Sequence, residues 1–198
     1  MSAGERLSRH ASMLRRAFGM LLRPGGTLAA GAAERATVSE LYLGYIAPLA
    51  AIGPVCGAIG LLVFGGGITG ISLKLSVEGV VLRAALDYGL TLLAVYLLAQ
   101  AISLMAPAFG GTASRIQALK LTAWSGTALW VSGLFAVYPT LGFVLAILGG
   151  MYSLYALYVG LPRLMRAPED RSLTYFAAVL VTIVLLALLF RGAASAVR

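Results

Sequence analysis

Residues 149–171, GGMYSLYALYVGLPRLMRAPEDR, join an aromatic-rich apolar segment to a short, densely charged turn. The apolar segment ends at Pro162, and apolar residues resume at Leu173 and continue to Phe190. Two apolar segments separated by a charged turn are typical of neighbouring membrane helices joined by a loop in water. The charged residues of the turn are Arg163, Arg166, Glu169, Asp170 and Arg171. This stretch therefore predicts a membrane protein.

The composition of the whole chain agrees with this prediction. Of its 198 residues, 60% are hydrophobic and 11% are charged, and the mean hydropathy is +0.93. Soluble domains contain roughly 45–50% apolar and 25% charged residues. The net charge of +8 is spread between apolar segments, which argues against a nucleic-acid partner and favours the anionic headgroups of a lipid bilayer. The excess of Arg over Lys indicates a bacterial protein, which we place in the inner membrane.

Five apolar segments are long enough to cross a membrane, since a spanning helix needs roughly 20 apolar residues. Tyr138-Pro139-Thr140 separates the third from the fourth, because proline cannot continue a helix. The predicted fold class is therefore all-α, a membrane bundle of five transmembrane helices in one domain over residues 41–190, followed by a short external tail over 191–198. The predicted spans are about 43–64, 84–108, 121–138, 141–161 and 173–190.

The positions of the basic residues predict the orientation of the chain. Loops on the cytoplasmic side of a membrane carry an excess of Arg and Lys. With a cytoplasmic N-terminus, the opposite side holds only Lys74, Arg191 and Arg198, with Arg83 just inside the second span. The C-terminus is then periplasmic or lumenal. The cytoplasmic segments hold Arg6, Arg9, Arg15, Arg16, Arg23, Arg35, Arg115, Lys120, Arg163, Arg166 and Arg171.

The first 40 residues are predicted to be cytoplasmic. Within them, residues 5–23 place apolar side chains such as Leu14 and Phe18 at helical spacing, with arginines such as Arg9 and Arg16 on the other side. This pattern favours an amphipathic helix that lies on the membrane surface and binds anionic headgroups. Pro24-Gly25-Gly26 is expected to end the helix. A disordered tail is the alternative interpretation.

The residues give little support to catalysis. His10 and Cys56 are the only histidine and the only cysteine, and they cannot form a metal site or a nucleophile of the ordinary kinds. We therefore expect no catalytic residues, no metal and no cofactor.

Two sets of residues inside the predicted spans are candidates for a role. Gly53, Gly57 and Gly60 form a small-residue face suited to helix packing, within the chain or in a homo-oligomer. Arg83 and Asp87, spaced i,i+4, either pair in the headgroup region or form a substrate or ion site. The other polar candidates are Ser125, Thr127, Tyr152 and Tyr155. Tyr152 lies near the expected midplane, where its hydroxyl needs a partner on another helix.

A cytoplasmic interaction surface is the remaining candidate site. It comprises Gln117, Lys120, Arg163, Arg166, Glu169, Asp170 and Arg171. The alternative is that the acidic residues of the turn only begin the last helix, where they complement the helix dipole.

Residues 110–175 resemble the second half of the Ypt-interacting-protein (Yip) domain family, particularly its bacterial members. The resemblance lies in the order and spacing of short motifs: Gly110-Gly111, Gln117-Ala-Leu-Lys120, Ser125-Gly-Thr127, Pro139, Tyr152-Ser-Leu-Tyr155, Gly160-Leu-Pro162, Leu164-Met165 and Pro168-Glu-Asp170-Arg171. Trp124 and Ala128 depart from the family pattern, which has Tyr and Pro there. The first half agrees through Glu40-Leu41-Tyr42 and Gly44.

The resemblance implies five membrane helices, a cytosolic N-terminus and a lumenal C-terminus. For eukaryotic relatives it also implies binding of Rab-type GTPases, oligomerisation and a part in vesicle formation or membrane shaping. We therefore expect a non-catalytic membrane scaffold or adaptor that contacts other membrane proteins or its own copies. The alternative is a small solute or ion transporter that uses the polar residues inside the spans.

Overall fold

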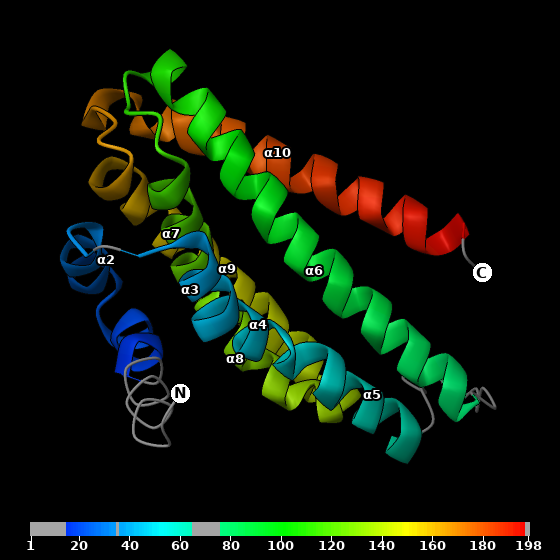
Figure 1. Ribbon diagram of the computed structural model, residues 1–198. Coiled ribbons are helices and arrows are strands. Elements are labelled where there is room, and N and C mark those ends of the chain that lie inside the picture. Colours follow the sequence, from blue (N-terminus) through cyan, green and yellow to red (C-terminus); the bar gives the residue numbers. More distant parts are fainter. Residues whose placement is uncertain (1–14, 35, 65–75, 197–198) are drawn as a thin grey trace.

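The computed structural model describes residues 15–34, 36–64 and 76–196, and every regular element in these ranges is a helix (Figure 1). Four helices are long and apolar enough to cross a membrane: Val38–Phe64, Val77–Phe109, Thr140–Leu164 and Glu169–Phe190. They correspond to the first, second, fourth and fifth predicted spans. The predicted all-α fold class is therefore confirmed, with four candidate spanning helices.

The first of these helices is composite. It consists of α3 (Val38–Leu41), the π-helical turn η1 (Tyr42–Ile46), α4 (Ala47–Ala50) and α5 (Ile52–Phe64). It begins ahead of the predicted residue 43 because Thr37 and Glu40 form a capping box, with reciprocal bonds of 3.3 and 2.9 Å. Pro48 and Pro54 each lack the N–H that an α-helix needs, which accounts for its interruptions.

The other three candidate spans are long and continuous. They are α6 (Val77–Met105) with its 3₁₀ extension η2 (Ala106–Phe109), α9 (Pro139–Leu164) and α10 (Glu169–Ala196). The 29 residues of α6 measure about 43 Å, which exceeds the roughly 30 Å of hydrocarbon in a bilayer. The predicted external tail is instead helical as far as Ala196, while residues 197–198 lie outside the described part of the chain.

The third predicted span, 121–138, differs from the expected continuous helix. It is divided into α7 (Arg115–Ser125), α8 (Thr127–Ser132) and the 3₁₀ helix η3 (Gly133–Val137). Two glycines lie at the divisions, and both make close contacts. A Cβ on Gly126 would lie 3.1 Å from the Trp130 ring, and one on Gly133 would lie 2.8 Å from the Cα of Gly53. Tertiary packing therefore overrides the propensity of this apolar segment to form one helix.

The divided segment nevertheless extends along the whole of α9. Just before α7, the Thr112 N–H donates to the carbonyl of Met165, at the end of α9, over 2.7 Å. After η3, the ring of Tyr138 lies 5.5 Å from that of Phe64, beside the start of α9. We call the end of the bundle where α9 ends and α10 begins the turn end, and the end near Phe64 the far end.

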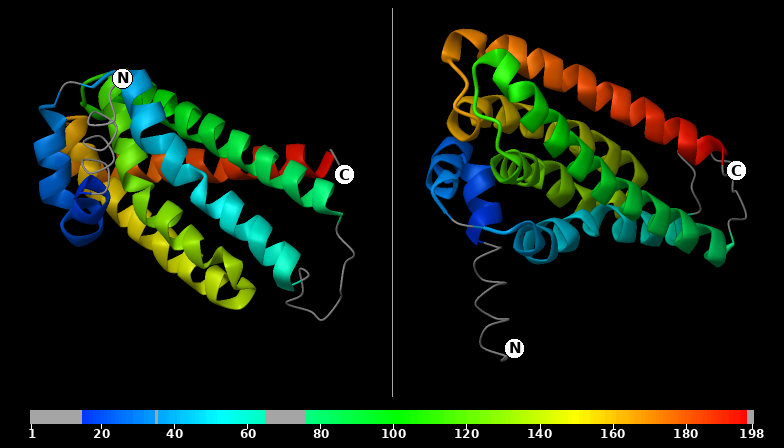
Figure 2. Two further views of the ribbon diagram at one scale, coloured as in Figure 1. Left: turned by 60° about the horizontal axis from the view of Figure 1, so that its bottom comes forward. Right: turned by 45° about the horizontal axis from the view of Figure 1, so that its top comes forward.

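Two further helices lie at the turn end, within the segment 1–40 in which one interfacial helix, over about 5–23, was predicted. Residues 15–22 are helical, residues 5–14 lie outside the described part, and Pro24 begins a second helix, α2 (Pro24–Ala32). Pro24 does end the first helix, but it also suits the first turn of the next one because its fixed φ is already helical. Residues 15–32, the N-terminal helix pair, pack against α7 and α9 (Figures 1 and 2).

Candidate functional site at the turn end of the bundle

Glycines allow α2 to approach the bundle closely. A Cβ on Gly31 of α2 would lie 2.3 Å from the Trp124 ring of α7. A Cβ on Gly160 of α9 would lie 2.3 Å from Leu121 and 3.2 Å from Leu28. Real side chains cannot occupy these positions without displacing their neighbours, so the two glycines are needed for α2 to lie where it does. Leu28 and Trp124 are almost completely buried as a result.

Two side chains of α7 bind the C-terminal end of α2. The ammonium of Lys120 donates to the carbonyls of Gly31 at 3.0 Å and Glu34 at 2.5 Å, and the Gln117 amide donates to the carbonyl of Ala32 at 2.9 Å. The last carbonyls of a helix have no partner within the helix and carry its negative dipole end. Lys120 and Gln117 therefore cap α2, and these two members of the predicted interaction surface are engaged inside the chain.

Lys120 is almost completely buried, at 1% exposed. Its ammonium lies 5.8 Å from the centroid of the Trp124 ring. Arg16 pairs with Glu34 at 2.5 Å and lies over the Trp124 ring, 4.9 Å from its centroid. These four side chains join the two N-terminal helices to α7.

Tyr152 binds the other helix of the N-terminal pair. Its hydroxyl lies 3.0 Å from the carbonyl of Met20 and 2.8 Å from that of Leu21, at the end of helix 15–22. Met20 is 1% exposed, whereas Phe18 and Leu22 are 62% and 78% exposed. The helix thus packs on α9 with one face and leaves apolar side chains on another. Tyr155, one turn on, is itself exposed, with its ring 6.0 Å from that of Tyr152.

The charged turn lies next to α2. A Cβ on Gly25 would lie 3.4 Å from the Arg163 guanidinium, which donates to the carbonyl of Val159 at 2.5 Å. Arg166 has a φ of +54°, the left-handed conformation that usually selects glycine after a helix. That conformation costs a non-glycine residue roughly 1–2 kcal/mol. All five charged residues of the turn are exposed: Arg163, Arg166, Glu169, Asp170 and Arg171.

The acidic residues of the turn are placed as helix starters. Glu169 and Asp170 occupy the first turn of α10, where negative charge complements the helix dipole. Asp170 and Arg171 lie 4.0 Å apart at exposed positions, so this ion pair adds little stability. Their geometry fits both interpretations of the turn, because a residue that begins a helix can also bind a partner.

The polar candidates near the Gly126 division are engaged in internal hydrogen bonds. The hydroxyl of Thr127 lies 2.7 Å from the Tyr45 hydroxyl and 2.7 Å from the carbonyl of Trp124. Ser125 donates to the carbonyl of Thr122 at 3.3 Å. The Leu129 N–H, freed by the division, donates to the hydroxyl of Ser153 at 3.1 Å. These bonds satisfy the interrupted backbone, as broken membrane helices require.

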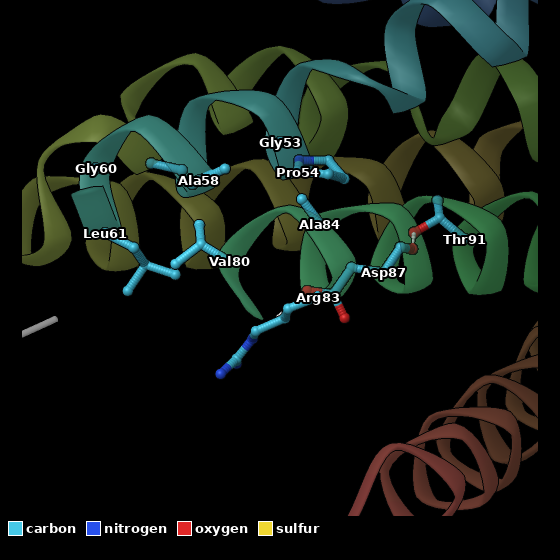
Figure 3. Close-up of a pocket in the computed structure, with 12 residues that line it drawn as sticks. Gly53, Pro54, Ala58, Gly60, Leu61, Val80, Arg83, Ala84, Asp87 and Thr91 are labelled. Carbon is cyan, nitrogen blue, oxygen red and sulfur yellow. Dashed lines mark hydrogen bonds and ion pairs between the residues drawn. The ribbon is translucent and has the colours of Figure 1, made fainter. Parts of the chain in front are cut away.

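A groove between α5 and α6 holds the other candidates, away from the turn end (Figure 3). It has a volume of about 420 Å³ and is lined by both Arg83 and Asp87. Their side chains are 58% and 52% exposed and lie 3.8 Å apart, and in Figure 3 Arg83 points away from α5. Asp87 is 10 residues into α6, about 15 Å from its far end. If the roughly 43 Å of α6 are centred on about 30 Å of hydrocarbon, Asp87 lies about 8 Å inside the boundary, and the long side chain of Arg83 can reach the headgroups.

The predicted glycine face divides between two roles. A Cβ on Gly60 would lie 2.6 Å from the carbonyl oxygen of Val137, and the Cα of Gly53 lies against Gly133. All three glycines line the groove, and a Cβ built on Gly53 or on Gly57 would have no atom within 4 Å. Gly60, and the backbone of Gly53, pack α5 against η3 within one chain.

Sequence reasoning missed α2 and the contacts of Arg16, Glu34 and Trp124. The signal for α2 was present, since Pro24 suits a first helical position and small residues follow it. The contact between Lys120 and Gly31 joins residues 89 positions apart, and one sequence contains no signal for it.

The comparisons with known proteins show the family of the chain. The Yip1 domain family matches residues 18–191, so the match includes most of the N-terminal helix pair. The inner membrane protein YohC of Escherichia coli strain K12 is 32% identical over 164 residues, which cover 78% of this chain and 84% of that protein. The protein of the same name from E. coli O6:H1 has the same identity and coverage. No solved structure matches the chain. The chain belongs to the Yip1 domain family of integral membrane proteins and is a homologue of YohC.

Proposed function

We propose that the protein is a non-catalytic scaffold or adaptor of the bacterial inner membrane. Its working surface is the turn end of the bundle, formed by the N-terminal helix pair and the charged turn 163–171. The observation that carries this proposal is the attachment of α2 by Lys120, which holds the N-terminal helix pair in a fixed position beside the charged turn. A preorganised face of this kind binds a protein partner at a lower entropic cost than a flexible tail. The partner is another membrane protein or a second copy of the chain.

The proposal includes five membrane passes, with α7, α8 and η3 together as the third. Its support is the path of residues 115–137, which begin beside Met165 and end beside Phe64, at opposite ends of α9. With five passes the termini lie on opposite sides, and the distribution of Arg and Lys favours a cytoplasmic N-terminus. A reporter fused after Arg198 is expected to face the periplasm, and a cytoplasmic readout would overturn the five-pass arrangement.

The adaptor role is tested by affinity capture after crosslinking in native membranes. We expect the double variant Asp170→Ala/Arg171→Ala to lose specific neighbours that the full chain captures, because it removes two exposed charges from the turn. Arg83→Ala/Asp87→Ala is the matched control, since it removes the same two residue types away from the turn end. Equal capture by both variants and the unaltered chain would refute the role of the turn.

A transporter is the second candidate function, and the observation in its favour is the division of the third segment at Gly126. Transporters build binding sites at such breaks. Against it, the hydroxyls at this break are engaged in internal bonds, as shown by the Tyr45–Thr127 pair. The two functions predict different results in a flux assay. If the chain is a transporter that uses Asp87, Asp87→Asn abolishes solute or ion flux in proteoliposomes; the scaffold proposal expects no specific flux before or after the change.

A further inference from the structure

A second cavity lies at the turn end, between α2, the start of α7 and the end of α9. It has a volume of about 430 Å³, within the range of small-molecule sites. Ala29 and Ala32 of α2 and Ala33, which directly follows it, form one wall. The polar wall consists of Thr112, Ser114, Gln117, Arg163 and Arg166. We call it the arginine cavity.

The charge of the cavity is positive. Two arginine residues line it, and among the described residues neither forms an ion pair with a carboxylate. Arg163 uses one nitrogen for the carbonyl of Val159, which leaves its other N–H groups available. The threonine and serine hydroxyls of the same wall can donate hydrogen bonds as well. The donors and the charge together fit an oxyanion, and arginine is well suited to phosphate because its N–H groups match two oxygens at once.

The backbone supports the same conclusion. Arg166 adopts a left-handed conformation in which glycine would be unstrained, and it is the only non-glycine residue in the described part of the chain to do so. The start of α7 contributes a positive dipole end: Ser114 makes no side-chain capping bond, and the first turn carries no acidic residue. These features add to the two arginines, which are the principal evidence.

The position of the cavity indicates where the anion comes from. The apolar span of α9 ends at Leu164, itself part of the cavity wall, and that of α10 begins after the turn. The cavity therefore lies at the level where an apolar span gives way to polar residues, which in a bilayer is the depth of the lipid phosphates. We propose that the arginine cavity binds the phosphate group of an anionic phospholipid. This proposal does not rest on the adaptor role, because its test involves no protein partner.

Arg166→Gly is the decisive variant. It removes one cation and also relieves the left-handed strain, so we expect the thermal unfolding temperature to be kept or raised while binding is lost. Arg171→Gln is the matched control, because it removes one exposed arginine from the same turn without lining the cavity. The full chain in mild detergent is titrated with phosphatidylglycerol or phosphatidylcholine, and bound lipids are counted by native mass spectrometry.

We expect one saturable phosphatidylglycerol site that binds at least about tenfold more tightly than phosphatidylcholine. Arg166→Gly should weaken this binding about tenfold, and Arg171→Gln should leave it within about twofold. Equal binding by Arg166→Gly and the unaltered chain would overturn the proposal, as would equal losses in the two variants. A parallel arm adds millimolar inorganic phosphate without lipid. One outcome is that phosphate alone raises the unfolding temperature of the unaltered chain but not of Arg166→Gly, while phosphatidylglycerol binds no more tightly than phosphatidylcholine. In that case the site binds phosphate and the lipid assignment is refuted.

Discussion

Replacing Lys120 with methionine is expected to release α2 from the bundle. Methionine keeps a long unbranched side chain but removes the donors to the carbonyls of Gly31 and Glu34. Hydrogen bonds to charged groups contribute about 1.5–3 kcal/mol each, so the two bonds together contribute about 3–6 kcal/mol. Part of this is offset because the variant no longer buries an ammonium that is 1% exposed in the bundle. We therefore expect α2 docking to weaken by about 2–4 kcal/mol, equivalent to roughly 30-fold to 1000-fold.

Hydrogen exchange of the α2 amides measures this change directly, because exchange of a docked helix follows its local opening equilibrium. In Lys120→Met, exchange over residues 24–32 should be faster by that factor, while α6 and α10 keep their protection. Gln117→Leu removes one neutral bond, of 2.9 Å to Ala32, and should accelerate exchange only about fivefold. The control is Arg115→Met, which removes an exposed charge from the same helix. If Lys120→Met exchanges no faster than Arg115→Met, Lys120 does not hold α2.

Two further predictions follow from contacts inside the bundle. Gly31→Ala should weaken α2 docking by about 1–3 kcal/mol because its Cβ would overlap the Trp124 ring, and exchange over 24–32 would again report it; an unchanged rate contradicts the close approach. Tyr45→Phe should lower the free energy of unfolding by about 0.6–1.7 kcal/mol through loss of the Thr127 bond, measured by detergent unfolding, whereas Tyr155→Phe at an exposed position should not.

The parts of the fold that follow from apolar length were predictable, and the parts that follow from packing were not. Four spans were visible because long apolar segments have no soluble alternative. The division at Gly126 could not be predicted, because a continuous helix and an interrupted helix of the same sequence have the same hydropathy. Burial of the Tyr152 hydroxyl predicted that it needs a hydrogen-bond partner. The partner is the backbone of Met20 and Leu21, more than 130 positions away in the sequence, and a single sequence does not identify it.

The same distinction applies to the candidate site. Lys120 and Gln117 were recognised as polar residues at the edge of a span, and a single sequence favours exposure for such residues. In the structure they bind α2, because the last carbonyls of that helix need donors. The charged residues of the turn 163–171, by contrast, are exposed as the composition of the turn predicted.

The central claim is that the turn end of the bundle contacts a protein partner. Photo-crosslinking in living cells tests it most directly, with a photoreactive amino acid in place of Arg171 at the turn and, as a control, in place of the exposed Leu185 in the span of α10. The account predicts a discrete protein adduct from position 171 that is absent from position 185, where lipid is the expected neighbour. Lipid adducts alone from both positions would contradict it.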